Sequence, residues 1–237
     1  PEVLADEPVR PVNDAPAIKQ ADIGVSMGIT GTDVAKDTAD MVLTDDNYVS
    51  IVSAVEQGRI IYSNIRKFVY YLISCNMGEI VIIFLPTIFG KLLFPDLTAE
   101  QLSPLAPVQL LWLNLISDGA PALALGTEKG DPDIMEQKPR PPKEPIINKQ
   151  MRWGVLIQTI AIASVTLFAF WRGLTHSELG NSDRLALAET MAFVTLSVSE
   201  LLRAYTARSE RYPLLKIGLF TNKWMNLAVL LSLVLLL

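Results

Sequence analysis

Five polar side chains lie inside two long apolar stretches of this sequence, at spacings that place them on shared helical faces. Asn76 and Glu79 are three residues apart in the first stretch, and Asn114, Ser117 and Asp118 occupy positions i, i+3 and i+4 in the second. Residues at these spacings are neighbours on a helix surface. Together they offer carboxylate, amide and hydroxyl oxygens, which a hard cation such as Ca²⁺ prefers. Because a carboxylate in an apolar stretch is energetically expensive, these residues predict a cation site.

A structural role is the alternative for Glu79 and Asp118, as hydrogen-bonded packing residues. Glu200, in a further apolar stretch, either adds a cation ligand or forms an ion pair with Arg203, three residues later. Cys75 is the single cysteine, so no disulfide can form within the chain. We expect Cys75 to be a small, inert core residue.

The elements that must position these residues are long apolar helices. A membrane-spanning helix needs ~20 mainly apolar residues. Four stretches reach this length and a fifth run begins near the end of the chain, over residues 68–90, 105–126, 153–171, 185–207 and from 224. The last run has only 14 residues, so we expect a truncated span, and because the chain begins with Pro1 we expect an incomplete N-terminus as well. The sequence therefore predicts a transmembrane helix bundle.

Charge is distributed unevenly along the chain. Residues 1–67 hold 11 acids and 6 bases, whereas residues 68–237 hold 14 of each. The basic loops 127–152 and 208–223 alternate with loops that are poor in Lys and Arg, so the positive-inside rule predicts that these two loops and the N-terminal region are cytoplasmic. The lipid bilayer is then the first expected partner. A net charge of −5 without a basic patch argues against nucleic-acid binding.

The N-terminal region has the pattern of a small α/β piece that continues into a helix. Two short apolar runs are typical of strands and the segment between them of a helix opening, at Ile23–Met27, Met41–Leu43 and Gly31–Thr38. From Asn47 a helical pattern continues into the first span. We therefore predict a mainly α-helical membrane protein with an α/β part, a connecting helix and a transmembrane domain, over residues 1–46, 47–67 and 68–237.

Several long motifs in a fixed order resemble one family. The run VNDAPAIKQADIGVSMGITGTDVAKDTADMVLTDDNYVSIVSAVEQGRIIYSNIRKF resembles the end of the phosphorylation domain and the stalk helix of type II P-type cation-transporting ATPases. The segments NMGE, NLISDGAPALALG and DPDIMEQKPRPP are similar to the membrane helices and loop that follow in that family. The resemblance covers residues 12–237. It implies that residues 1–46 are the remnant of a HAD-like phosphorylation domain and that the four full spans are the family's fifth to eighth helices.

The resemblance also implies a set of cation ligands and a cation. The residues that match the family's ligands are Asn76, Glu79, Asn114, Ser117 and Asp118, with Glu200 matching the eighth-helix acid of two-site calcium pumps. Sodium/potassium pumps typically have Asp at the position of Asn114 and Pro at the position of Gly78, whereas calcium pumps match this chain. Ca²⁺ is therefore the expected cation, with Mn²⁺ and Na⁺ as alternatives.

The catalytic part of the family pattern is incomplete. In the motif GDGVNDAP the first Asp holds magnesium, and Arg10 stands at that position here. Asn13 and Asp14 match accessory residues that help position the phosphorylated Asp. The sequence contains no DKTGT segment, nucleotide-binding domain or actuator domain. We expect that the chain does not hydrolyse ATP by itself, and that Mg²⁺ and ATP act only in the intact pump.

Three interpretations follow. The chain is the C-terminal fragment of a calcium-type pump, a split subunit that joins a separate N-terminal polypeptide, or a non-catalytic membrane protein that binds cations. In the first two, the partner is the missing N-terminal part of the pump, in the same or a separate chain.

Overall fold

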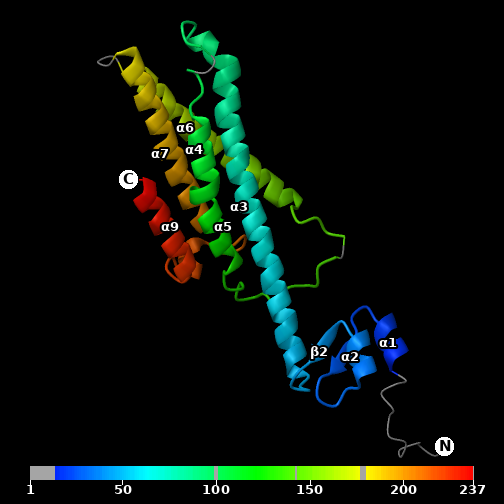
Figure 1. Cartoon of the computed structure of the whole chain (residues 1–237). Coiled ribbons are helices and arrows are strands. Elements are labelled where there is room, and N and C mark those ends of the chain that lie inside the picture. Colours follow the sequence, from blue (N-terminus) through cyan, green and yellow to red (C-terminus); the bar gives the residue numbers. More distant parts are fainter. Residues whose placement is uncertain (1–13, 99–100, 142, 177–179, 237) are drawn as a thin grey trace, which may run out of the picture. The chain divides into compact units, whose positions relative to one another are not determined.

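The computed structural model describes residues 14–98, 101–141, 143–176 and 180–236. The chain divides into two compact units, Pro1–Arg59 and Ile60–Leu237. The helices and strands are labelled in Figure 1.

The described part of the first unit contains a small βαβ arrangement. Its elements are α1 (Ala15–Gln20), β1 (Val25–Met27), α2 (Asp33–Thr38) and β2 (Met41–Leu43). The strands pair in parallel, with Val25 opposite Met41 and Met27 opposite Leu43. Parallel strands need a crossover connection, which α2 supplies. The predicted strands and helix are confirmed, except that β1 begins at Val25 rather than Ile23 and α2 at Asp33 rather than Gly31.

Asp46 holds the loop after β1 against the turn after β2. Its carboxylate accepts hydrogen bonds from the backbone N–H groups of Ile29 (2.9 Å) and Thr30 (2.8 Å) and from the Thr30 hydroxyl (2.8 Å). Asp46 has a φ of 50°, in the left-handed region that Asp tolerates better than most residues. The hydrogen bond from Ile29 is the main reason that the pKa of Asp46 lies below its usual 3.8, because this donor favours the ionised form.

We expect acid to release this loop. Because the pKa of Asp46 is lowered in the folded unit, its stabilising contribution is fully present above the unfolded pKa of about 4 and is lost as the pH falls through the lowered folded pKa. In NMR titrations of the full chain, the amide signals of Ile29 and Thr30 should shift only below pH ~4. Asp46→Asn should abolish this shift and Asp22→Asn, at an exposed site, should not. A midpoint above that pH contradicts the prediction.

The second unit is a bundle of long helices. It contains the greater part of α3 (Val49–Leu93), then α4 (Pro107–Trp112), a π-helical turn (Leu113–Ser117) and α5 (Gly119–Gly126), followed by α6 (Lys149–Leu174), α7 (Asn181–Thr206), α8 (Leu214–Ile217) and α9 (Lys223–Leu236). In Figure 1, α4 lies beside the upper part of α3, α6 crosses α3 obliquely, and α9 lies next to α7.

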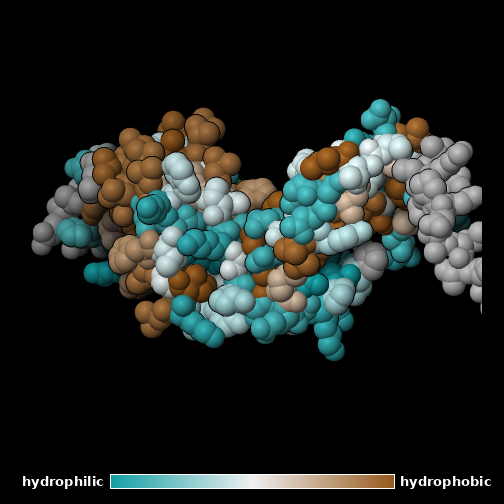
Figure 2. Space-filling model, turned by 90° about the horizontal axis from the view of Figure 1, so that it is seen from below, coloured by the Kyte–Doolittle hydropathy of each residue, from teal (hydrophilic) through white to brown (hydrophobic). Residues whose placement is uncertain are grey.

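Four helices of the described chain are long and apolar enough to cross a membrane: Val49–Leu93, Pro107–Gly126, Lys149–Leu174 and Ser182–Thr206. They include the four predicted spans, with ends that differ by a few residues except at the start of α3, which continues the first span toward the N-terminus. Large apolar side chains point outward from them, as at Leu111, Leu123 and Phe168, which are 67%, 79% and 60% exposed. Figure 2 shows hydrophobic residues on the flanks of the bundle and hydrophilic ones at the end that faces the viewer. Outward apolar faces are expected for helices surrounded by lipid.

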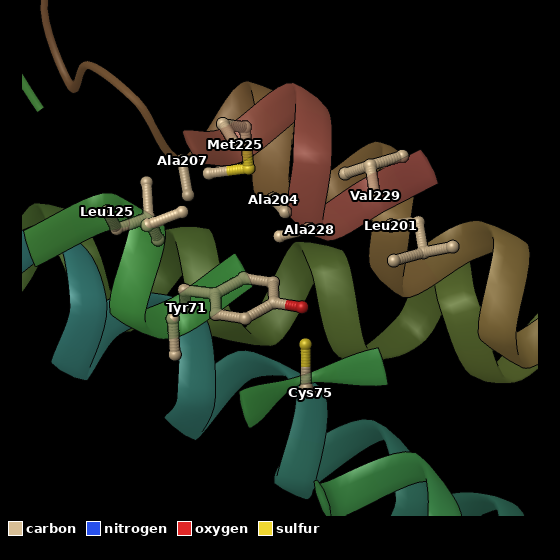
Figure 3. Packing of buried hydrophobic residues seen from close by; sticks show 11 residues of the cluster. Tyr71, Cys75, Leu125, Leu201, Ala204, Ala207, Met225, Ala228 and Val229 are labelled. Carbon is tan, nitrogen blue, oxygen red and sulfur yellow. The ribbon is translucent and has the colours of Figure 1, made fainter. Parts of the chain in front are cut away.

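Small residues let the helices of the bundle approach closely. A Cβ atom on Gly173 of α6 would clash with the backbone of Ala188 in α7, so glycine is needed at this contact. A second packed region joins α3, α5, α7 and α9 through Tyr71, Leu125 and Met225, all 0% exposed (Figure 3).

A buried ion pair joins the end of α5 to the segment after α7. The guanidinium of Arg208 donates through Nε and Nη2 to the two carboxylate oxygens of Glu128, at 2.8 and 2.9 Å. Its Nη1 donates to the carbonyls of Gly218 (2.8 Å) and Leu219 (3.0 Å). Asn222 Nδ2 also donates to Glu128, at 2.8 Å. This network joins Glu128 to residues that lie 80 and 94 positions later in the sequence.

Candidate cation site

The first predicted ligands come from α3. Glu79 is 5% exposed, and both its carboxylate oxygens lie near Asn114 Nδ2, at 3.0 and 3.3 Å. Asn76 is half-buried, and its Nδ2 donates to the carbonyl of Leu72 at 2.8 Å in its own helix. The structure therefore joins one pair across the two predicted stretches, Glu79 with Asn114.

The second stretch is an interrupted helix. Pro121 has no N–H, so the carbonyl of Ser117, four residues earlier, has no partner in the helix. It lies 3.4 Å from the Tyr71 hydroxyl, and the carbonyl of Ile116 accepts from Ser232 Oγ at 3.1 Å. The sequence predicts that the helix loosens at Gly119 and Pro121. The irregular π-helical turn lies just before these two residues, because a proline leaves the carbonyl one turn earlier without its helical hydrogen bond.

Asp118 follows this turn and lies at the centre of the site. It is 0% exposed, and its Oδ1 accepts a hydrogen bond from the Tyr71 hydroxyl at 2.9 Å. Its Oδ2 has no hydrogen-bond partner within the described part of the chain, and the same holds for the buried hydroxyl of Ser117. Buried polar atoms without partners are costly and rare. They are expected where a cation is to be bound.

Glu200 of α7 reaches the same place. It is 0% exposed, and neither carboxylate oxygen has a hydrogen-bond partner among the described residues. Single ligand atoms of Glu200, Asp118 and Cys75 all lie within 4.8 Å of one another. The fourth span thus brings a second unpaired carboxylate next to Asp118.

The alternative ion pair of Glu200 is not formed. Among the residues that the structure describes, no ion pair within 4.0 Å joins Arg203 to Glu200. Arg203 instead donates from Nη1 to Thr206 Oγ1 at 2.9 Å and lies over the ring of Tyr70, 4.7 Å from its centroid. The carboxylate of Glu200 therefore stays available.

The remaining predicted residues belong to the N-terminal unit. Asn13 lies outside the described residues, and Asp14 is exposed at the start of α1, where its side chain makes no cap hydrogen bond. Tyr71 is a residue of the site that the sequence did not predict. The spacing of Tyr71, Cys75 and Glu79, four residues apart along α3, was the signal that could have found it.

Comparison with known proteins identifies relatives of this chain. The family described as "Cation transporting ATPase, C-terminus" matches residues 102–237, more than half of the chain. The chain is 44% identical over 232 residues to "Calcium-transporting ATPase 1" of Bacillus cereus, which covers 93% of this chain and 25% of that protein. It is 46% identical over 226 residues to "Calcium-transporting ATPase" of Bacillus subtilis, covering 95% of this chain and 24% of the relative. It is 40% identical over 219 residues to "Calcium-transporting ATPase type 2C member 1" of Mus musculus, covering 92% of this chain and 22% of that relative.

The chain belongs to the family of P-type cation-transporting ATPases. It spans about a quarter of the length of these relatives and matches their C-terminal membrane region. With four apolar helices long enough to cross a bilayer, it is an integral membrane protein.

Proposed function

We propose that this chain supplies the C-terminal membrane part of the cation site of an ATP-driven calcium pump. The ligands are Asn76, Glu79, Asn114, Ser117, Asp118 and Glu200. The observation that carries the proposal is the pair of fully buried carboxylates, Asp118 and Glu200, which each have a ligand oxygen within 4.8 Å of the other and together have three oxygens without a hydrogen-bond partner among the described residues. A cation between them would compensate both charges.

Oxygen chemistry supports Ca²⁺ as the transported ion. Calcium takes six to eight oxygen ligands in flexible geometry, and the carboxylates, amides and the Ser117 hydroxyl are of this kind. The names of the relatives agree with this choice. Mn²⁺ and Na⁺ also bind oxygen and are the alternative ions.

The catalytic cycle needs parts beyond these residues. We infer that the N-terminal unit is the end of a HAD-like phosphorylation domain in which Asn13 and Asp14 have accessory roles. ATP, Mg²⁺ and the phosphorylated Asp would act in the rest of the pump, on the cytoplasmic side together with loops 127–152 and 208–223. Because the connecting helix and the first span are one continuous helix, α3, phosphorylation would change the position of Asn76 and Glu79 and so couple chemistry to cation release.

Glu79→Gln tests the site. Residues 12–237 are fused behind the head domain of a related pump, and phosphoenzyme formation is measured against Ca²⁺ concentration. Loss of the charge should raise the half-maximal Ca²⁺ concentration roughly tenfold or more, since ligand charge sets calcium affinity. Glu189→Gln in α7 is the matched control and should change nothing. An unchanged calcium dependence in Glu79→Gln would reject the assignment.

A further inference from the structure

Cys75 lies inside the candidate cation site, although a calcium site takes oxygen ligands and does not need a sulfur atom. It is 0% exposed, and its Sγ belongs to the group of ligand atoms with Asp118 and Glu200 that lie within 4.8 Å of one another. In Figure 3 the sulfur points away from the axis of α3, toward the hydroxyl of Tyr71. Tyr71 in turn donates to Asp118. The thiol therefore faces the two carboxylates and does not fill a purely apolar gap.

Most of the carboxylate oxygens near this thiol lack a hydrogen-bond partner among the described residues. Asp118 Oδ2 and both oxygens of Glu200 have no hydrogen-bond partner in the described chain. Arg203, the cation nearest to Glu200 in sequence, binds Thr206 and lies over Tyr70. Three buried ligand atoms thus converge on one place, and three of the four carboxylate oxygens are free to bind a metal.

A sulfur ligand changes which metal ion a site of this kind prefers. Calcium is a hard ion that takes oxygen ligands, whereas Zn²⁺ and the softer Cd²⁺ bind thiolate strongly and also accept carboxylates. A tetrahedral ion with bonds of about 2.0–2.3 Å holds its ligands roughly 3.5 Å apart. The ligand atoms of the three side chains would need to move about 1 Å closer to one another, and small changes in side-chain torsion angles allow this movement.

We propose that Cys75, Asp118 and Glu200 form a mixed sulfur–oxygen site for a thiophilic divalent cation, which makes Cys75 a specificity-determining residue. This inference rests on the proposed calcium site, because the two ions share Asp118 and Glu200. On binding, a metal–sulfur bond replaces the S–H bond of Cys75 and the proton is released to water. A thiophilic ion then occupies the calcium ligands and competes with Ca²⁺.

Cadmium titration of the full chain in lipid nanodiscs tests the proposal. Bound Cd²⁺ is measured by equilibrium dialysis, and the thiolate-to-metal charge-transfer absorption is recorded in the ultraviolet. Because the chain has one cysteine, any such absorption reports Cys75 alone. We expect saturation at one Cd²⁺ per chain. Cys75→Ser should abolish the absorption and weaken Cd²⁺ binding at least tenfold, while Ca²⁺ binding changes less than about threefold.

Asp118→Asn keeps the thiol and gives a second test. It should weaken both Cd²⁺ and Ca²⁺ binding at least tenfold, whereas the control Glu189→Gln should weaken neither. Circular dichroism confirms that each variant keeps its helices.

The outcomes separate this inference from the proposed function. Ca²⁺ binding without a charge-transfer band, or Cd²⁺ binding that is unchanged in Cys75→Ser, overturns the thiophilic site and leaves the calcium site standing. A band with Cd²⁺ but no Ca²⁺ binding supports the thiophilic site and rejects the calcium site.

Discussion

Arg208→Met should lower the free energy of unfolding by about 3–5 kcal/mol, because it leaves Glu128 as a buried charge without its partner. Arg208 is 1% exposed, and its guanidinium makes a two-point contact with the Glu128 carboxylate at 2.8 and 2.9 Å. The substitution also removes the donors that bind the carbonyls of Gly218 and Leu219. These contacts hold the chain after α7 against the end of α5, so their loss should loosen this end of the bundle.

Arg211→Met is the matched control for this prediction. Arg211 lies three residues later and also forms an ion pair, with Asp133 at 3.2 Å, but its side chain is 56% exposed. Exposed ion pairs contribute about 0–1 kcal/mol, so this variant should be almost as stable as the original chain. Thermal unfolding in detergent, followed by circular dichroism, compares the two. Equal unfolding midpoints for the two variants would contradict the inferred role of the buried pair.

Asp118→Asn should raise the Ca²⁺ concentration needed for phosphorylation of the fused pump roughly 100-fold, equivalent to about 2.8 kcal/mol of binding free energy. Asp118 is fully buried, accepts a hydrogen bond from Tyr71 and has a ligand oxygen within 4.8 Å of a ligand oxygen of Glu200. An amide keeps the size of the side chain but removes its negative charge. The effect should therefore exceed that of Glu79→Gln, whose carboxylate already accepts from Asn114.

Two further variants show why Asp118→Asn raises the Ca²⁺ concentration needed for phosphorylation. Asp96→Asn, at an exposed position outside the spans, should leave the calcium dependence unchanged. Tyr71→Phe removes the hydrogen bond to Asp118 but keeps the carboxylate, so the calcium requirement should rise less than about tenfold. If Tyr71→Phe and Asp118→Asn have equal effects, Asp118 acts through its hydrogen bond and not as a ligand.

Much of the fold could be predicted because it depends on local patterns. The four spans follow from the lengths of apolar stretches, and over each of them the structure has a helix that is long and apolar enough to cross a membrane. The strand Met41–Leu43 was predicted with its observed bounds. The irregular turn before Asp118 also has a local cause, the missing N–H of Pro121, although its π-helical form was not predicted.

The arrangement of the site was harder to predict because it depends on contacts between distant helices. The spacing of Glu200 and Arg203 allowed an ion pair, yet Arg203 contacts Thr206 and Tyr70. The sequence also favoured an inert Cys75, since a lone buried thiol in an apolar helix carries no sign of its neighbours. The pairing of Glu128 with Arg208 joins residues 80 positions apart, which no periodicity reveals.

The sequence by itself determined the class of this protein, the number of its long spans and the acids placed within them, because hydropathy and helical spacing act over short distances. Only the tertiary structure decided which of these side chains meet. It brought single ligand atoms of Cys75, Asp118 and Glu200 from three separate helical segments to within 4.8 Å of one another and left three of the four carboxylate oxygens without a hydrogen-bond partner among the described residues. The physical reason is that helix packing, set by close contacts such as Gly173 against Ala188, fixes which faces of the helices point inward.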